Sequence, residues 1–181
     1  MGKSVFPLFD FKVAGKALLE EAQLGHALRE IHVSDAIGKL DEVSVRFKWD
    51  EDTDKKVSKL KAHGSAFILT INKSSKPGSW KKSREIHGDI MEVEFLRNTF
   101  EDVLVLRGLS PMHRLKTSFQ AKVYEAKKQS DVVKGTVTNS GLSAQADGTA
   151  GSAQNYIQGG QSDAAFLQRL MRDNPTFIMR T

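Results

Sequence analysis

Alternation of apolar and polar residues dominates the first half of the chain. Between residues 42 and 49 and between residues 9 and 13 the two kinds of side chain alternate strictly, and residues 28–33 show a weaker alternation. A helix built from these stretches would scatter its apolar residues all round, whereas a strand places them on one buried face. The pattern therefore predicts three strands, the first ending at Gly15 and the other two joined by a turn at residues 35–38.

Three further apolar runs follow. Residues 66–71 are nearly all apolar, which is typical of a strand buried on both faces. Residues 86–96 and 103–109 indicate a long β-hairpin, in which Gly88 marks a bulge or a close approach of two backbones. The first half of the chain is thus predicted to hold five or six strands, enough for a barrel or a sandwich.

Two polar stretches between these runs are expected to be loops. Residues 50–54 are charged and predict a loop tip. Residues 72–84 contain Pro77-Gly78 and predict a long basic loop between two strands.

The pattern changes after Ser110-Pro111. Residues 119–124 predict another strand, and Ser130 is expected to cap a short helix that ends before Gly141. Residues 142–154 are small and polar, which predicts a mobile loop.

The last helix has the clearest signals in the sequence. Ser162 is a suitable N-cap, Asp163 suits the positive end of the helix dipole, and Asn174-Pro175 should end the helix. The following residues, 176–181, predict a strand at which the chain stops, so the second domain is expected to be truncated. One apolar stripe is expected to form the structural core of this helix: Phe166, Leu167, Leu170 and Met171.

These elements predict a mainly β protein with an α+β part. We expect an antiparallel β-barrel, or a strongly curved antiparallel sheet, over residues 1–108, followed by a small α+β domain over residues 109–181.

Composition narrows the possible chemistry. Hydrophobic residues make up 39% of the 181 residues and charged residues 27%, which is ordinary for a soluble protein. The absence of cysteine excludes disulfides, thiolate zinc sites and cysteine nucleophiles. No apolar run approaches the ~20 residues of a membrane span, and the N-terminus lacks a signal-peptide segment. We therefore expect a soluble protein made in the cytoplasm.

No motif for catalysis, metal binding or cofactor binding stands out. Asp50, Asp52 and Asp54 match three positions of a calcium loop, but Lys55 and Lys61 occupy the positions that require Gly and Glu. The five histidines lack ligand spacing, the nucleophile and phosphate-loop motifs are absent, and Gly159-Gly160 is expected to be an ordinary loop pair. We expect no catalytic residue, metal or cofactor.

The basic loop is the one candidate contact site. Its cations with an aromatic residue among them would suit phosphates and a stacked base, but a solvated loop or a protein contact would have the same composition. Residues 72–84 contain no acidic residue. The candidate contact residues are Lys73, Lys76, Trp80, Lys81, Lys82 and Arg84.

Several segments follow one another along the chain in a recognisable order, among them the strand at residues 87–95, the stretch 103–116 and the helix start at Ser130-Asp131. In this order they resemble the hub family of contractile injection machines: phage late-control protein D, baseplate hub proteins and the N-terminal region of VgrG. A departure is Asn174-Pro175-Thr176, where the family usually has Gly followed by Ile or Leu. The strongest match is to the family pattern Gln-x-x-x-(Ser/Thr)-Asp-x-x-Phe-Leu-x-Arg-Leu, through Gln158, Ser162, Asp163, Phe166, Leu167, Arg169 and Leu170.

The resemblance implies a structural role. A hub of this kind joins the inner tube to the spike, forms a homotrimer, and contacts inner-tube, spike and baseplate proteins within a virion tail or injection particle. The second barrel, OB-fold and needle of larger relatives do not fit in 181 residues. Two alternatives remain open: a nucleic-acid-binding barrel that uses the basic loop, which would bind less tightly as salt rises, and a cell-wall hydrolase, for which no residue pair stands out.

Overall fold

The computed structural model describes residues 9–19, 24–34, 40–59, 61–76, 79–97, 99–145 and 152–173, and of residues 73–76 and 79–83 it describes the backbone only. The chain divides into two compact units, Met1–Ser110 (unit 1) and Pro111–Thr181 (unit 2).

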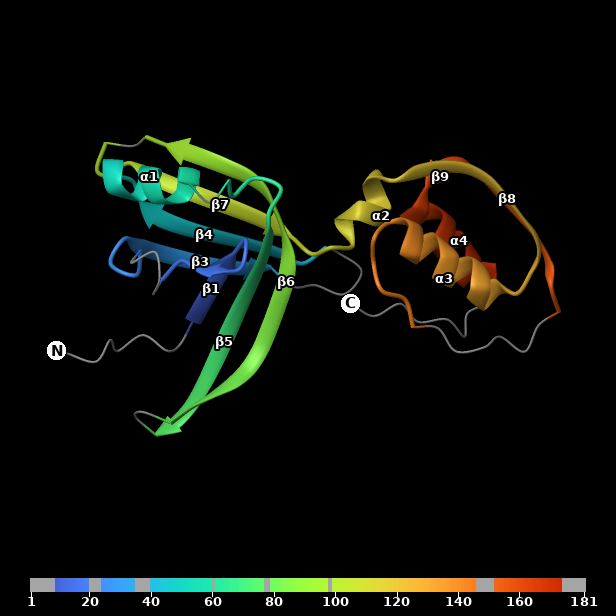
Figure 1. Ribbon diagram of the computed structural model, residues 1–181, viewed down its shortest axis with the longest axis horizontal. Helices are drawn as coiled ribbons and strands as arrows, with labels where there is room; N and C mark the ends of the chain where they lie inside the picture. Colours follow the sequence, from blue (N-terminus) through green and yellow to red (C-terminus); the bar gives the residue numbers. More distant parts are fainter. Residues whose placement is uncertain are drawn as a thin grey trace. The chain divides into compact units, whose positions relative to one another are not determined.

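Unit 1 is built on one seven-stranded antiparallel sheet (Figure 1). The strand order is β2-β1-β5-β6-β7-β4-β3, and in the described part of the chain the edge strands β2 and β3 do not pair. The prediction of a mainly β, antiparallel architecture is confirmed, whereas a closed barrel is not found. The strands are β1 (Phe9–Val13), β2 (Lys16–Ala17), β3 (Leu28–Ser34), β4 (Glu42–Lys48), β5 (Ala66–Lys76), β6 (Ser79–Leu96) and β7 (Val103–Leu109).

One face of this sheet forms the core of unit 1. The alternating pattern at residues 42–48 gives β4 three fully buried apolar side chains with polar residues between them. Side chains from β1, β4, β5, β6 and β7 join into one apolar cluster, so the sheet curves around a single core. Its largest fully buried members are Phe11, Leu18, Leu24, Phe47, Phe67, Leu69, Ile90, Leu104 and Leu106.

Two glycines make room for a phenylalanine where β6 passes from one neighbour strand to the next. A Cβ on Gly88 would lie 2.2 Å from the Leu109 carbonyl oxygen and 2.3 Å from the Phe67 ring. A Cβ on Gly108 would lie 2.2 Å from the same ring. Asp89 pairs with both Ala66 and Leu109, so the close packing falls where β5, β6 and β7 meet. The predicted close approach at Gly88 is confirmed.

The prediction of a loop tip at residues 50–54 is wrong, because a helix, α1 (Glu51–Lys59), begins there. The Asp50 carboxylate accepts a hydrogen bond from the Thr53 backbone N–H at 2.8 Å and so caps the helix. Two ion pairs of i, i+4 spacing, Lys55 with Glu51 and Lys56 with Asp52, support its exposed face.

The prediction of a long loop at residues 72–84 is also wrong. β5 continues to Lys76 and β6 begins at Ser79, and the two strands stay paired along this stretch. A hairpin already in register therefore continues past the core into a sequence with loop composition. Pro77 and Gly78 lie outside the described residues.

Unit 2 packs helices against a two-stranded antiparallel sheet. The predicted strand at residues 119–124 is confirmed as part of β8. Its elements are α2 (His113–Thr117), β8 (Phe119–Lys127), α3 (Gln129–Asn139), β9 (Gln154–Ser162) and α4 (Asp163–Asp173).

The ends of α3 were predicted with mixed success. Lys128, not Ser130, occupies the N-cap position, because the helix starts one residue before Ser130. The prediction for Gly141 is confirmed: its φ is +71°, and the Leu142 N–H bonds to the Val137 carbonyl while the Gly141 N–H bonds to that of Thr138. This bond pattern is a Schellman motif, in which glycine tolerates the left-handed conformation.

Strand β9 contradicts the prediction of a loop pair at Gly159-Gly160, since both glycines lie inside it. In the segment expected to be a mobile loop, residues 142–145 and 152–153 have no regular secondary structure, and residues 146–151 lie outside the described residues. The predicted turn at residues 35–38 and the predicted strand at residues 176–181 also lie outside them. Among the helices of the described ranges, none has the length and apolar character needed to cross a membrane.

Candidate partner-contact surfaces

The described residues assemble no metal centre. No three metal-binding side chains gather anywhere in the described ranges. The larger hollow, about 280 Å³, lies open between α1 and β6, and its walls combine the apolar Val57, Val93 and Phe95 with polar side chains at the rim. A smaller one of about 110 Å³ lies beside Trp49.

The first feature is an arm, which we define as residues 72–76 of β5 and residues 79–84 of β6. Beyond Ile71 no pairing of β5 with β1 is present in the described residues, and β6 pairs with β7 only from Asp89 onward. Among the described residues, the two strands of the arm are therefore paired only with each other. Figure 1 shows β5 and β6 running on together past β1.

Every predicted contact residue lies on this arm. The register places Lys73 opposite Lys81, Ser74 opposite Trp80 and Lys76 opposite Ser79. Lys82 pairs with Asn72, and Arg84, which is exposed, pairs with Ile71. The side chains of the other five, Lys73, Lys76, Trp80, Lys81 and Lys82, lie outside the description.

The charge of the arm differs from that of the rest of the sheet. The arm has five basic residues and no acidic one, so the other residues of the chain hold 22 of each sign and the net charge of +5 resides in the arm. In the body of the sheet opposite charges meet across strands. Arg46 pairs with Glu30 at 3.0 Å, and Arg107 lies 3.2 Å from Glu92 and 3.1 Å from Glu94.

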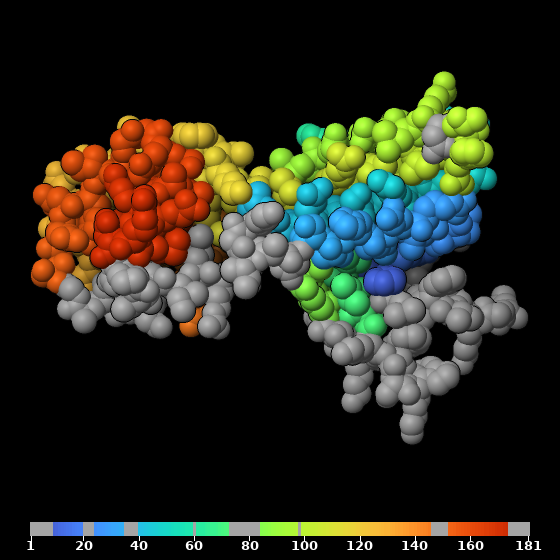
Figure 2. Space-filling view, turned by 180° about the vertical axis from the view of Figure 1, so that it is seen from behind, coloured from blue at the N-terminus to red at the C-terminus, as the bar shows by residue number. Residues whose placement is uncertain are grey.

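The second feature is an exposed apolar face on unit 2. Phe119, Val123 and Ile157 are 67%, 56% and 62% exposed, although all three lie in strands. Val123 is directly opposite Ile157, so the two share the outer face of the β8–β9 ribbon. Figure 2 shows part of the surface of β9 and α4 in orange and red. Sequence reasoning missed this face because β9 was not predicted.

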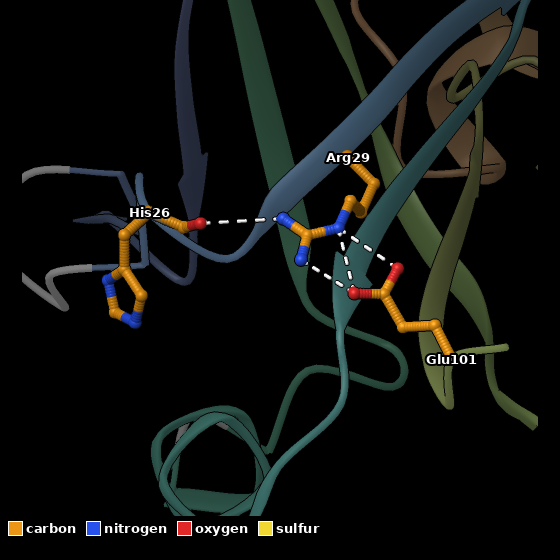
Figure 3. Close-up of polar contacts among 3 residues, drawn as sticks. All are labelled: His26, Arg29 and Glu101. Carbon is orange, nitrogen blue, oxygen red and sulfur yellow. Dashed lines mark hydrogen bonds and ion pairs between the residues drawn. The ribbon is translucent and has the colours of Figure 1, made fainter.

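A surface ion pair in unit 1 joins β3 to the connection between β6 and β7 (Figure 3). The Arg29 Nε donates to both carboxylate oxygens of Glu101 at 3.0 Å, and Nη2 donates at 2.6 Å. Arg29 belongs to β3 and Glu101 to the β6–β7 connection, so the pair ties distant segments together. The hydrogen bond from Arg29 lowers the pKa of Glu101 below its usual range. A bridge so exposed contributes little to stability at ordinary pH.

The most buried carboxylate belongs to Asp163, at the first turn of α4. Its oxygens accept hydrogen bonds from Gln158 Nε2 at 2.7 Å and from Ser140 Oγ at 2.8 Å, and its side chain is fully buried. Ser140 is the C-cap of α3, so this carboxylate links the end of one helix to the start of the next. Asp163 lines neither of the two hollows described above.

The apolar stripe of α4 packs beside this network. Phe166, Leu167 and Leu170 are buried, and Met171 is partly exposed. The Phe166 ring stacks on Tyr124 with centroids 5.8 Å apart. Ser162 Oγ accepts a hydrogen bond from the Ala165 N–H at 3.2 Å, which confirms the predicted N-cap. Arg169 bonds to the Ile157 carbonyl and lies over the Phe166 ring.

Comparison with known proteins gives structural likeness only. The sequence matches no family model and no curated protein. It is similar in structure to the 43 kDa tail protein of prophage MuSo2 from Shewanella oneidensis, with a TM-score of 0.61 and 12% identity over 90% of this chain and 48% of that one. A tail protein from Neisseria meningitidis MC58 gives a TM-score of 0.55 and 14% identity over 91% of this chain and 44% of that one.

A third structure has a weaker likeness. It is an E. coli protein described as a component of the type VI secretion system, with a TM-score of 0.48 and 12% identity over 79% of this chain and 42% of that one. At these identities the first two matches show the fold alone. This chain spans about half the length of those tail proteins or less.

Proposed function

We propose that this chain is a structural subunit of a phage tail or a related contractile injection machine. The observation that carries the proposal is the fold shared with a tail protein over 90% of this chain, at a TM-score of 0.61. The resemblance of its sequence segments to the hub family, in the same order, supports it independently. Its surface adds a long projecting arm and an exposed apolar face, features that suit contact with neighbouring subunits.

Within such a machine we infer the place of a hub between inner tube and spike. The resemblance implies a homotrimer in which two barrels per chain form a ring that matches a sixfold tube. Unit 1 contributes a single seven-stranded sheet, to which we assign the part of one such barrel in the ring. We therefore expect the isolated chain to be a monomer or a weak oligomer. A stable trimer by light scattering would contradict this expectation and place the trimer contacts within these residues.

The proposal is tested by following the chain into particles. An epitope-tagged copy is expressed in the native host, particles are purified on a density gradient, and the tag is quantified alongside tube and baseplate proteins by mass spectrometry. We expect the tagged chain to co-sediment with intact particles at a fixed ratio to them. An unrelated tagged protein of similar size serves as the control. Recovery of the chain only in the soluble fractions, while particles assemble normally, would contradict the structural role.

A further inference from the structure

The β5–β6 arm holds an arrangement that the stability of unit 1 does not require. Beyond Ile71 it leaves the shared core of the sheet and continues as a two-stranded ribbon, with no further strand paired to either side in the described residues. A two-stranded ribbon is at best marginally stable in water, and a third strand or another contact stabilises it. The outer edges therefore present backbone donors and acceptors to whatever lies beside them.

The charges along the arm disfavour the ribbon when it stands alone. Lys73 and Lys81 occupy directly opposite positions, and like charges at such positions destabilise a strand pair. Elsewhere in the sheet the corresponding positions hold opposite charges, as with Glu30 and Arg46. Lysines on a strand edge discourage edge-to-edge aggregation, a role that one or two of them can fill. The concentration of the chain's whole net charge of +5 in these two strands goes beyond that role and is complementary to an anionic partner.

We propose that the arm docks on an acidic surface of a neighbouring protein subunit. The partner's identity as a subunit rests on the proposed function, whereas the anionic chemistry rests on the arm itself. A protein is favoured over nucleic acid because its backbone can add to the open edges of the ribbon while its carboxylates meet the lysines. Nucleic acid supplies only the charge and a base for Trp80.

Three variants of the full chain isolate the contribution of the arm. The first replaces its five basic residues by glutamine. The second variant, called body-glutamine, is a matched control. It replaces five exposed lysines outside the arm by glutamine: Lys16, Lys59, Lys116, Lys127 and Lys134. The third keeps the charge of the arm by exchanging its lysines for arginine and Arg84 for lysine.

The probes for the purified variants are fluorescent poly-L-glutamate and, separately, single- and double-stranded oligonucleotides. We expect the arm-glutamine variant to bind polyglutamate about tenfold more weakly than the wild type at low ionic strength, and the charge-keeping variant to bind normally. The body-glutamine variant should lose much less affinity for polyglutamate. Equal losses in the two glutamine variants would overturn the proposal, because only net charge would then matter. Tighter binding of oligonucleotides that depends on the arm would overturn it in favour of nucleic acid.

A single substitution separates docking from a structural role. Lys73→Glu creates an opposite-charge pair with Lys81, so hydrogen exchange of the arm's amides should slow while polyglutamate binding weakens. A loss of both protection and binding would mean that Lys73 serves only the ribbon, and would contradict the proposal.

The same variants are then followed into particles. We expect the arm-glutamine variant to be incorporated several-fold less than the body-glutamine variant. Equal incorporation of the two would contradict docking by the arm. If the wild type itself is absent from particles, the proposed function fails, and the polyglutamate comparison still decides the chemistry of the arm.

Discussion

The two units of the chain hold their folds together in different ways. In unit 1 the core cluster is apolar and is drawn from five strands and α1. In unit 2 the apolar cluster is small, and the buried residues beside it include Gln129, Thr136, Gln158 and Asp163. Unit 1 satisfies its backbone within a seven-stranded sheet, whereas the described residues of unit 2 include two strands and join helix ends through side chains.

This difference shows where each unit is vulnerable. The stability of unit 1 depends on the shape of apolar side chains, above all on the Phe67 ring over Gly88 and Gly108. The stability of unit 2 depends on the hydrogen bonds that its buried polar groups do make, because a buried group that loses its partner costs more than an average hydrogen bond contributes. Both tryptophans, Trp49 and Trp80, lie in unit 1 and both tyrosines lie in unit 2, so each unit has its own spectroscopic reporter.

Phe67→Ala should have the largest effect. The change removes a fully buried ring and leaves a cavity between two glycines, and we expect a loss of about 3–5 kcal/mol in the free energy of unfolding of unit 1. Urea unfolding followed by tryptophan emission measures it. Phe95→Ala is the control, because that ring is 53% exposed and its loss should cost far less. Equal effects of the two would contradict the packing described for the core.

Asp163→Ala should destabilise unit 2 by about 3 kcal/mol, because Gln158 and Ser140 lose a charged acceptor at a buried site. The readout is the tyrosine signal in near-ultraviolet circular dichroism during urea unfolding. Asp131→Ala provides the control: Asp131 lies in the first turn of α3 but is exposed, so its loss should cost about 0.3–1 kcal/mol. If Asp163→Ala leaves the free energy of unfolding of unit 2 nearly unchanged, the hydrogen bonds of Asp163 are not what joins the two helices.

Gly135→Ala and Gly141→Ala should change the stability of unit 2 in opposite directions. Gly135 lies inside α3 with open space where a Cβ would go, so alanine should stabilise the helix by about 0.5–1 kcal/mol. Gly141 has a φ of +71°, so alanine there should destabilise by about 1 kcal/mol. The change in Tm of each variant is measured by thermal unfolding. A change of the same sign in both would contradict the helix end described above.

The smallest predicted effect is a dependence of unit 1 on acidic pH. The backbone and side-chain hydrogen bonds of Thr53 lower the pKa of Asp50, and the hydrogen bond from Arg29 lowers that of Glu101. A carboxyl group whose pKa is lower in the folded state stabilises the fold above its unfolded pKa, and that contribution is lost as pH falls through the folded value.

The midpoint of urea unfolding of unit 1, followed by tryptophan emission, should therefore fall as pH drops below the ordinary carboxyl range of about 4. In the double variant Asp50→Asn, Glu101→Gln this fall should be shallower. An identical slope in the variant would contradict the assignment of these two groups.

Most strands of unit 1 could be predicted from the sequence, because a sheet with one face in the core imposes a period of two. Residues 42–48 show the rule, with three apolar side chains fully buried. The same rule failed for β9, in which Tyr156 is only partly buried and the one buried side chain is the polar Gln158. Helix α1 could not be predicted either, because a helix is recognised by an apolar stripe and only Thr53 and Val57 of α1 are buried.

The candidate site could be predicted only in part. The excess of basic residues at 72–84 is plain in the sequence, but its composition indicated a loop. Pairing with an established hairpin overrode that local preference, and only the register shows Lys73 opposite Lys81. The apolar face of Phe119, Val123 and Ile157 needed the structure as well, because it depends on β8 and β9 lying side by side.

Deletion of the gene tests the structural role most directly. The gene is removed in frame from the native host or prophage, and released particles are counted by negative-stain electron microscopy. We expect few or no complete particles, with assembly restored by wild-type copies supplied in trans. Normal numbers of complete, functional particles without this chain would contradict the account.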